Sequence, residues 1–354
     1  MDPLTPAAEL AERLQVSSEA VTLCREAELI DLHLDTFIPH RLWGYDWFER
    51  HRGGPLGRHF FGHLDWPRLA DGGLSGGHWS ITTNPFRRAA GRWMWFQRNL
   101  ERIEGLIAGS GGRMKLVTTH GEYLQARRAG HHAAMIAIQG GNALDAAPDG
   151  VASIPGDRVV RITLVHLTNA SLGATNSPHH YLATSKGLTT SGRAFVESCN
   201  ERRVFVDLAH IHEKGFWDAV EVHDPTQPLI VTHAGVDGVR PHWRNLTDDQ
   251  IRAVADSGGV VGVIFHPMFL TRPGGPRDAQ MVIEHLEHIH QVGGETVAAL
   301  GSDYDGAISP TPDLAGGDRY PVLVQKMLDR GWSDTRIRGV LGENYLQSFA
   351  RLRP

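Results

Sequence analysis

Short apolar runs rich in β-branched residues alternate with longer helical patterns along almost the whole chain. This alternation indicates parallel β-α-β units rather than a meander or a sandwich. Eight such runs fit a closed barrel, so the sequence predicts an α/β fold, a (β/α)8 TIM-type barrel with extra helices at the termini. The predicted strands cover residues 27–35, 78–84, 133–139, 159–166, 203–210, 228–233, 259–266 and 296–303.

Helical patterns fill the segments between these runs, and several begin with Thr or Ser and end at Gly, which supports their boundaries. No internal repeat, low-complexity tract or Gly/Ser linker divides the chain. We therefore expect one barrel domain over residues 1–354, with a core at about 27–350. The predicted helices cover residues 92–109, 121–130, 190–203, 212–222, 247–258 and 279–293.

Charge and composition narrow the class of partner. The formal net charge is -5 and no basic run occurs, which argues against nucleic acid or an anionic membrane and favours a small ligand. The two cysteines, Cys24 and Cys199, have no disulfide-framework or metal-site spacing. The first residues lack signal-peptide features and no run approaches about 18 apolar residues, so we expect a cytoplasmic protein. A homodimer is expected from the general frequency of twofold assemblies.

Polar residues close most of the predicted strands, at the barrel face that carries active sites in this architecture. His33 and Asp35 end the first strand as an HxD pair, and their spacing of two points both side chains the same way. Imidazole nitrogens and carboxylate oxygens together suit a divalent metal of the zinc type. The fourth, fifth, sixth and eighth strands are closed by His166, His210, His233 and Asp303.

Each of these positions is a weak signal when taken alone. A single histidine at a strand end is more often structural than a ligand, and HxD is a common pattern. The conjunction of an HxD pair, two later histidines and a final aspartate is what indicates a metal site. Asp207 has the opposite pleat phase and is expected to be structural, while for His266 a position on the rim and simple packing both stay open.

Several segments, in this order, resemble the membrane (renal) dipeptidase family of zinc metallopeptidases, peptidase family M19, among the amidohydrolase-type barrels. The resemblance runs from about residue 27 to residue 350 and so covers almost the whole chain. The matching segments are DLHLD, HWSIT, IQGGNAL, VRITLVHLTNASLG, VDLAH, THAG, RNLTDDQIRAVADSGGVVGV, LGSDYDGA and GVLGENYLQSF.

The resemblance implies one or two zinc ions as cofactor. His33 and Asp35 would bind the more buried metal, and His210 and His233 would bind the second. Two metals generate a nucleophilic hydroxide at neutral pH and polarise the peptide carbonyl. The implied activity is hydrolysis of small dipeptides by metal-activated water.

The resemblance also implies three roles toward the substrate. Arg244, in the RNLTDDQ segment, would hold the free C-terminal carboxylate of the dipeptide through a bidentate contact. His166 would contact the substrate carbonyl or the tetrahedral intermediate, and Asp303 would transfer the proton. Tolerance of a D-residue on the C-terminal side, as in L-Xaa-D-Xaa, is implied by the family alone.

Gln139 departs from the family pattern, which places a metal-bridging glutamate at the end of the third strand. An amide offers one neutral acceptor oxygen and an NH2 group that cannot coordinate, so it cannot bridge two cations as a carboxylate does. We therefore expect weaker occupancy of at least one metal position.

Three outcomes of this substitution stay open: two metals bridged by hydroxide alone, a single working metal, or a catalytically impaired protein that binds a small ligand. Hydrolysis of a lactone or phosphoester is disfavoured, because those barrels usually carry an HxH pair and a bridging lysine, whereas this chain has His33-x-Asp35.

Overall fold

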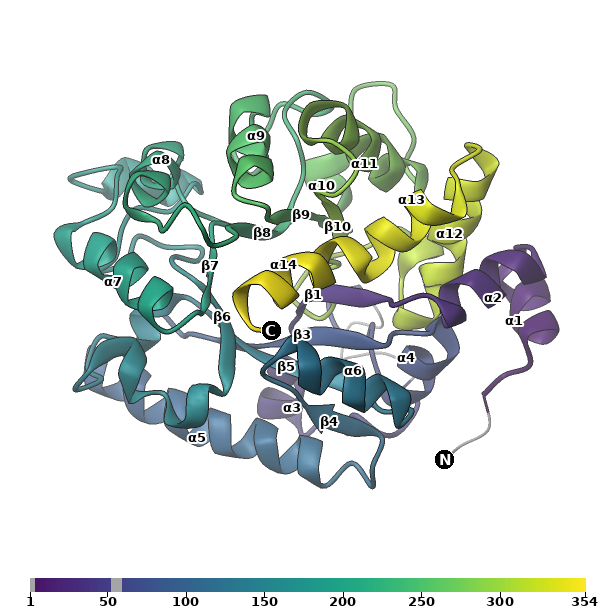
Figure 1. Ribbon diagram of the computed structural model, residues 1–354, viewed down its shortest axis with the longest axis horizontal. Helices are drawn as coiled ribbons and strands as arrows, with labels where there is room; N and C mark the ends of the chain where they lie inside the picture. The colour runs from purple at the N-terminus through teal and green to yellow at the C-terminus, as the bar shows by residue number, and fades with distance from the viewer. Residues whose placement is uncertain (1–3, 52–58) are drawn as a thin grey trace.

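The eight predicted strands all form, and they pair in parallel as a closed barrel surrounded by helices (Figure 1). The computed structural model describes residues 4–51 and 59–354. Around the barrel the strand order is β3-β1-β10-β9-β8-β7-β6-β5, and pairing of β5 with β3 closes it, which confirms the predicted (β/α)8 fold. The strands are β1 (Ile30–Leu34), β3 (Gly76–Thr82), β5 (His132–Gln139), β6 (Val159–Thr163), β7 (Phe205–Asp207), β8 (Ile230–Ala234), β9 (Val260–Val263) and β10 (Ala298–Leu300).

A further short strand, β4 (Met114–Leu116), pairs with β5 and lies outside the closed ring. The sequence analysis did not predict it, because three residues with a lysine in the middle carry too little apolar periodicity to stand out.

The helices wrap the outside of the barrel and begin where capping residues allow them to. Thr119, Thr189 and Thr247 each accept a backbone N–H of the first helical turn, and Thr247 forms a reciprocal capping box with Gln250. The helices are α1 (Ala7–Leu14), α2 (Ser18–Glu26), α3 (Phe37–Trp43), α4 (Trp66–Gly72), α5 (Ala89–Ala108), α6 (His120–Arg128), α7 (Thr190–Glu201), α8 (Glu213–Val222), α9 (Asp248–Asp256), α10 (Pro267–Leu270), α11 (Gln280–Gly293), α12 (Tyr320–Asp329), α13 (Asp334–Arg338) and α14 (Asn344–Leu352).

The C-terminal helix α14 closes the end of the barrel at which the strands begin. Its Tyr345 and Phe349 pack in one buried apolar cluster with Phe205 and Val260, the first residues of β7 and β9 (Figure 1). Full burial of side chains of this size contributes about 1.5–3 kcal/mol each. Because α14 covers the end at which the strands begin, a ligand can reach the barrel only at the carboxyl ends of the strands.

Within the described part of the chain, no helix combines the length and apolar character needed to cross a bilayer.

Candidate metal and active site

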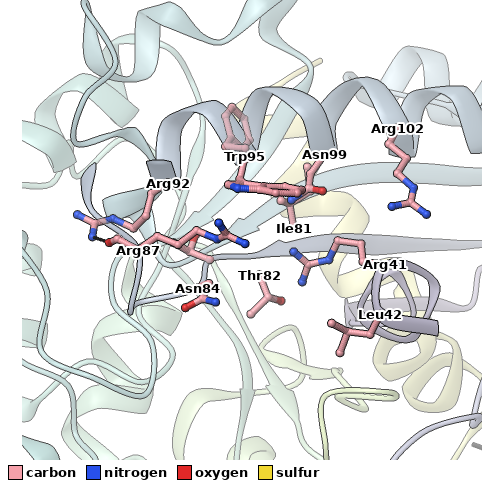
Figure 2. Close-up of a pocket in the computed structure, with 13 residues that line it drawn as sticks. Arg41, Leu42, Ile81, Thr82, Asn84, Arg87, Arg92, Trp95, Asn99 and Arg102 are labelled. Atoms are coloured by element: carbon pink, nitrogen blue, oxygen red, sulfur yellow. Dashed lines mark hydrogen bonds between the residues drawn. The ribbon is translucent and has the colours of Figure 1, made fainter. Parts of the chain in front are cut away.

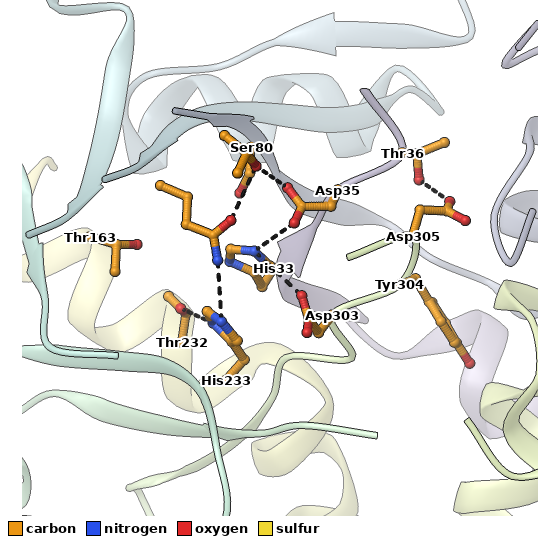
Figure 3. Close-up of polar contacts among 12 residues, drawn as sticks. His33, Asp35, Thr36, Ser80, Thr163, Thr232, His233, Asp303, Tyr304 and Asp305 are labelled. Carbon is orange, nitrogen blue, oxygen red and sulfur yellow. Dashed lines mark hydrogen bonds and ion pairs between the residues drawn. The ribbon is translucent and has the colours of Figure 1, made fainter. Parts of the chain in front are cut away.

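Three strands carry polar side chains to the carboxyl end of the barrel. His33 is the fourth residue of β1, Gln139 is the last residue of β5, and His233 lies in β8, and all three are buried. Figure 3 shows His33 between Asp35 and Asp303, with His233 on the neighbouring side. The predicted strand-end residues therefore converge on one centre.

Two further residues reach this centre from strained backbone positions. His210 and Asp303 follow β7 and β10 with φ angles of 66° and 64°, in the left-handed region that residues other than glycine seldom adopt. Such conformations cluster at functional sites, where the surrounding structure holds them.

The left-handed turn at His210 also changes the placement of Asp207. Strand alternation predicted opposite directions for these two side chains, but both contact the barrel interior, because the turn interrupts the alternation. Asp207 accepts hydrogen bonds from the Thr163 hydroxyl at 2.6 Å and from the Thr232 hydroxyl at 2.8 Å. The structural role predicted for Asp207 agrees with these contacts.

The donor set has the dimensions of a site for one divalent ion. Ligand atoms of His33, His233 and Asp303 lie within 4.8 Å of one another. The Nε2 atom of His33 is 3.5 Å from an oxygen of Asp35 and 3.6 Å from an oxygen of Asp303. The Nε2 atoms of His210 and His233 are 2.9 Å apart. Nitrogen and oxygen donors of this kind suit a cation of the zinc type.

His233 has the protonation pattern of a metal ligand. Burial lowers the pKa of His233 well below the usual range, as it does for His210, so both rings are neutral. Thr232 donates its hydroxyl hydrogen to Asp207, and the same oxygen can therefore accept the Nδ1–H of His233 at 2.8 Å. This leaves the Nε2 lone pair of His233 directed into the site, the arrangement that outer-shell partners give to ligating histidines.

Gln139 does not complete a site for two ions. Its Oε1 accepts a hydrogen bond from Thr82 at 3.1 Å, and its Nε2 lies 3.4 Å from the Nε2 atoms of both His210 and His233. The Thr82 hydroxyl also lies 2.6 Å from an Asp35 oxygen. The amide NH2 therefore faces the two imidazoles that would hold the second ion, and it offers that ion no lone pair.

A buried arginine lies directly beneath the cluster. Arg161 of β6 is fully buried, donates to Nδ1 of His33 at 3.1 Å and to the Ser80 hydroxyl at 3.0 Å, and pairs with Asp207 at 3.3 Å. Burial lowers the pKa of Arg161, whereas Asp207 and Asp35 raise it. The guanidinium therefore keeps its positive charge. This charge lies beside a site that, with Gln139 in place of a glutamate, already has one negative charge fewer to bind a metal cation.

The residues predicted to handle substrate lie around the same centre. Burial lowers the pKa of His166 to about 4, and its ring lies 4.7 Å from the ring of His210. Burial lowers the pKa of Arg244 to about 10, still well above neutral pH. Arg244 donates to the backbone oxygen of His233 and forms no ion pair with any described carboxylate. Burial and the Asp35 carboxylate raise the pKa of Asp303 well above its usual range, while Arg244 acts to lower it.

His266 is half-buried beside the barrel mouth. It lies at the start of α10 with its ring 4.9 Å from the ring of Phe269, and it does not belong to the donor set described above. These contacts fit both a position on the rim and simple packing, so both stay predictions.

Sequence reasoning missed Thr82, Thr232 and Arg161. The two threonines carry no signal, because threonine is ordinary in strands. Arg161 did carry one, since a charged residue inside the apolar run VVRITLVH, predicted to be a barrel strand, must be paired or functional.

Comparison with known proteins places the chain among metallopeptidase relatives. The family described as membrane dipeptidase (peptidase family M19) matches residues 17–352. Mouse dipeptidase 3 is 27% identical over 343 residues, which is 96% of this chain and 67% of that protein. An uncharacterized Klebsiella pneumoniae protein in the pqqA 5' region is 37% identical over 170 residues, 46% of this chain and 60% of that protein. This second match therefore spans less than two thirds of that relative.

A solved structure supports the same relationship. The metallopeptidase from Rhodobacter sphaeroides, liganded with a phosphinate mimic of the dipeptide L-Ala-D-Ala, superimposes with a TM-score of 0.81 at 25% identity. The superposition covers 92% of this chain and 99% of that one.

Proposed function

Because the chain belongs to the membrane dipeptidase family, peptidase family M19, we propose that it hydrolyses small dipeptides with a free C-terminal carboxylate. The observation that carries this proposal is the convergence of His33, His233 and Asp303 within 4.8 Å, with Arg244 beside the same cluster. The dipeptide mimic bound by the Rhodobacter sphaeroides relative supports a small peptide, including one of the L-Xaa-D-Xaa type, as substrate.

We infer that zinc is the cofactor and that one ion is held more firmly than a second. His33, His233 and Asp303 would hold this ion, and a bound divalent cation would supply polarisation of the scissile carbonyl and activation of water. The amide of Gln139 supports the single-ion proposal, because it cannot replace the bridging carboxylate.

The side chains around the cluster can carry the remaining steps. Arg244 has free guanidinium donors to hold the substrate carboxylate. The Asp303 carboxylate lies 3.6 Å from Nε2 of His33 and is placed to take a proton from the attacking water and to pass it to the leaving amine. His166 is neutral above about pH 4 and can donate a hydrogen bond to the oxygen that becomes negative as the amide is attacked.

A second candidate function is binding of a small ligand without turnover. The position of the Gln139 NH2 group, 3.4 Å from two ligand-type nitrogens, favours this alternative, because hydrogen bonds to those lone pairs compete with a metal. A cytoplasmic location and a homodimeric assembly stay predictions from the sequence.

Hydrolysis of a mixed L,L and L,D dipeptide library by zinc-reconstituted protein, beside a chelated sample, tests the proposal. We expect turnover that the chelator abolishes and zinc restores. A folded, zinc-loaded protein that cleaves no dipeptide would contradict the peptidase proposal and favour the binding protein.

A further inference from the structure

A cavity of about 420 Å³ opens beside the candidate metal ligands His33, His233 and Asp303, here called the metal-ligand cluster, between α3, the end of β3 and α5 (Figure 2). Thr82 lines this cavity and also contacts Asp35 and Gln139, so the cavity adjoins the candidate active site directly. Ile81, Phe96 and the ring of Trp95 give it an apolar wall.

The cavity is strongly cationic. Four arginines line it, Arg41, Arg87, Arg92 and Arg102, and no aspartate or glutamate does. Arg92 is neutralised by Asp145. The other three form no ion pair with any described carboxylate, and Figure 2 shows them extending toward the same space.

Neutral partners hold two of these cations in place. The guanidinium of Arg87 lies 4.4 Å from the ring centre of Trp95. Arg102 donates to Nε2 of His40 at 3.1 Å, and Nδ1 of His40 donates to the backbone oxygen of Tyr45 at 2.8 Å. These contacts orient the guanidinium groups and leave their charges uncompensated.

Arg41 brings a further hydrogen-bond donor to the cavity wall. Its Nε atom is buried and has no partner among the described residues. A buried donor on a cation is stabilised when an acceptor, such as a ligand carboxylate or a water molecule, binds to it. Arg41 lies within electrostatic range of Asp35 on one side and of Arg87 and Arg102 on the other, which places it at the boundary of the cluster and the cavity.

The barrel order fixes where this cavity lies relative to Arg244. Thr82 ends β3 and Arg244 follows β8, and these strands are four places apart in either direction around the ring of eight. The arginine cavity and Arg244 therefore lie on opposite sides of the barrel mouth, with the metal-ligand cluster between them.

We propose that the arginine cavity binds a carboxylate on the acyl side of the scissile amide, while Arg244 holds the carboxylate of the leaving amino acid. The orientation of the substrate rests on the proposed function. The substrate class is then an amide with a negative charge at each end: a dipeptide with an N-terminal glutamate or aspartate, or an amino acid acylated by a dicarboxylic acid. Guanidinium groups bind carboxylates through paired hydrogen bonds, and several of them together favour binding of a negatively charged group over a neutral one.

Two matched ligand pairs test this proposal and distinguish the sources of the carboxylate. Zinc-reconstituted protein is assayed with L-Glu-L-Ala against L-Gln-L-Ala, and binding to the chelated protein is measured by calorimetry with N-succinyl-L-alanine against N-butyryl-L-alanine. We expect the anionic member of at least one pair to be preferred by about tenfold or more, with the preference weakening at high salt.

Variants of the cavity arginines test whether the preference for the anionic ligand arises in the cavity. In Arg87→Gln and in Arg41→Gln the ratio within the preferred pair should fall toward one, whereas Arg88→Gln, a neighbouring exposed arginine outside the cavity, should keep it. Arg87 is exposed, so its replacement is not expected to disturb folding even where that of Arg41 does.

The two assays separate this inference from the peptidase proposal. Binding preference without hydrolysis of any dipeptide would overturn the peptidase function and leave the cavity assignment standing. Hydrolysis with no preference in either pair, or a preference unchanged in Arg87→Gln, would overturn the cavity assignment.

Discussion

The Arg161 guanidinium lies 3.1 Å from Nδ1 of His33 and donates a hydrogen bond to it. A guanidinium has no acceptor, so the Nδ1 lone pair of His33 is used and the ring hydrogen lies on Nε2. That atom faces the carboxylates of Asp35 and Asp303 at 3.5 and 3.6 Å. The ring thus presents an N–H to them, and ligation of a metal by His33 competes with the contact from Arg161.

Replacing Arg161 by Gln should raise zinc affinity, by about tenfold, because a side-chain oxygen could accept the Nδ1–H of a ligating His33. Zinc competition against a chromophoric chelator measures this, and Arg193→Gln, a change in a more exposed ion pair, serves as the control. Unchanged zinc affinity in a folded Arg161→Gln protein would contradict the competition described above.

The same substitution should destabilise the fold. Asp207 would lose its buried cationic partner, and breaking a buried pair costs about 3–5 kcal/mol. The threonine and backbone donors that remain on Asp207 place the expected loss in the free energy of unfolding at the lower end. Urea unfolding of wild type and variant in the absence of metal measures it.

Gln139→Glu should restore a bridging carboxylate and add one negative charge between the two imidazoles. We expect the zinc stoichiometry to rise from about one to about two and kcat/KM for dipeptides to rise by about tenfold or more. Metal analysis after dialysis and initial rates check both values. Gln139→Met, which lacks both charge and amide, is the control, and an unaltered zinc content in Gln139→Glu would argue against a bridging role for this position.

The barrel could be predicted from the sequence because its signal is local. Each strand is an apolar run and each helix a periodic pattern with caps, so all eight strands were placed within a few residues of their observed bounds. The residues at the strand ends were also predictable, because a parallel barrel gathers them at one face.

The remaining features depend on tertiary contacts. Arg41 and Arg87 come from α3 and from the segment before α5, and nothing in the sequence shows that these segments share one cavity. The inward placement of Asp207 depends on the left-handed turn at His210, which strand alternation cannot reveal. The contact of Arg161 with His33 likewise joins strands that are not neighbours in the barrel.

His132, a buried histidine at the start of β5, should lower the free energy of unfolding as the pH falls. Burial lowers the pKa of His132 to about 4, and the ring accepts from the Trp79 indole and lies 2.9 Å from the Leu74 oxygen. The pKa of His132 in the folded protein lies below the value of about 6.5 expected in the unfolded chain, so the folded state binds fewer protons. The stability that is present above about pH 6.5 is therefore lost as the pH falls toward 4. The contribution of this one group is about 3 kcal/mol.

Urea unfolding between pH 7.5 and pH 4.5 measures the effect. His132→Gln keeps an acceptor for Trp79 without a titratable ring, so its stability should fall less over this range than that of wild type. Equal losses in the two proteins would show that His132 is not among the groups responsible.

Arg244→Ala should raise the KM for dipeptides by about ten- to a hundredfold, because the charge-assisted bonds to the substrate carboxylate are lost. Zinc content should not change, since Arg244 contacts the backbone of His233 and not its ligating nitrogen. Arg244→Lys keeps the positive charge but lacks the paired N–H donors of a guanidinium, so it should recover only part of the affinity for the dipeptide that Arg244→Ala loses. A dipeptide with an amidated C-terminus provides the decisive comparison: wild type should discriminate against it strongly and Arg244→Ala should not. If wild type and Arg244→Ala discriminated equally against the amidated dipeptide, another cation would have to bind the C-terminal carboxylate. The arginines of the cavity on the opposite side of the barrel mouth would then be the residues to substitute.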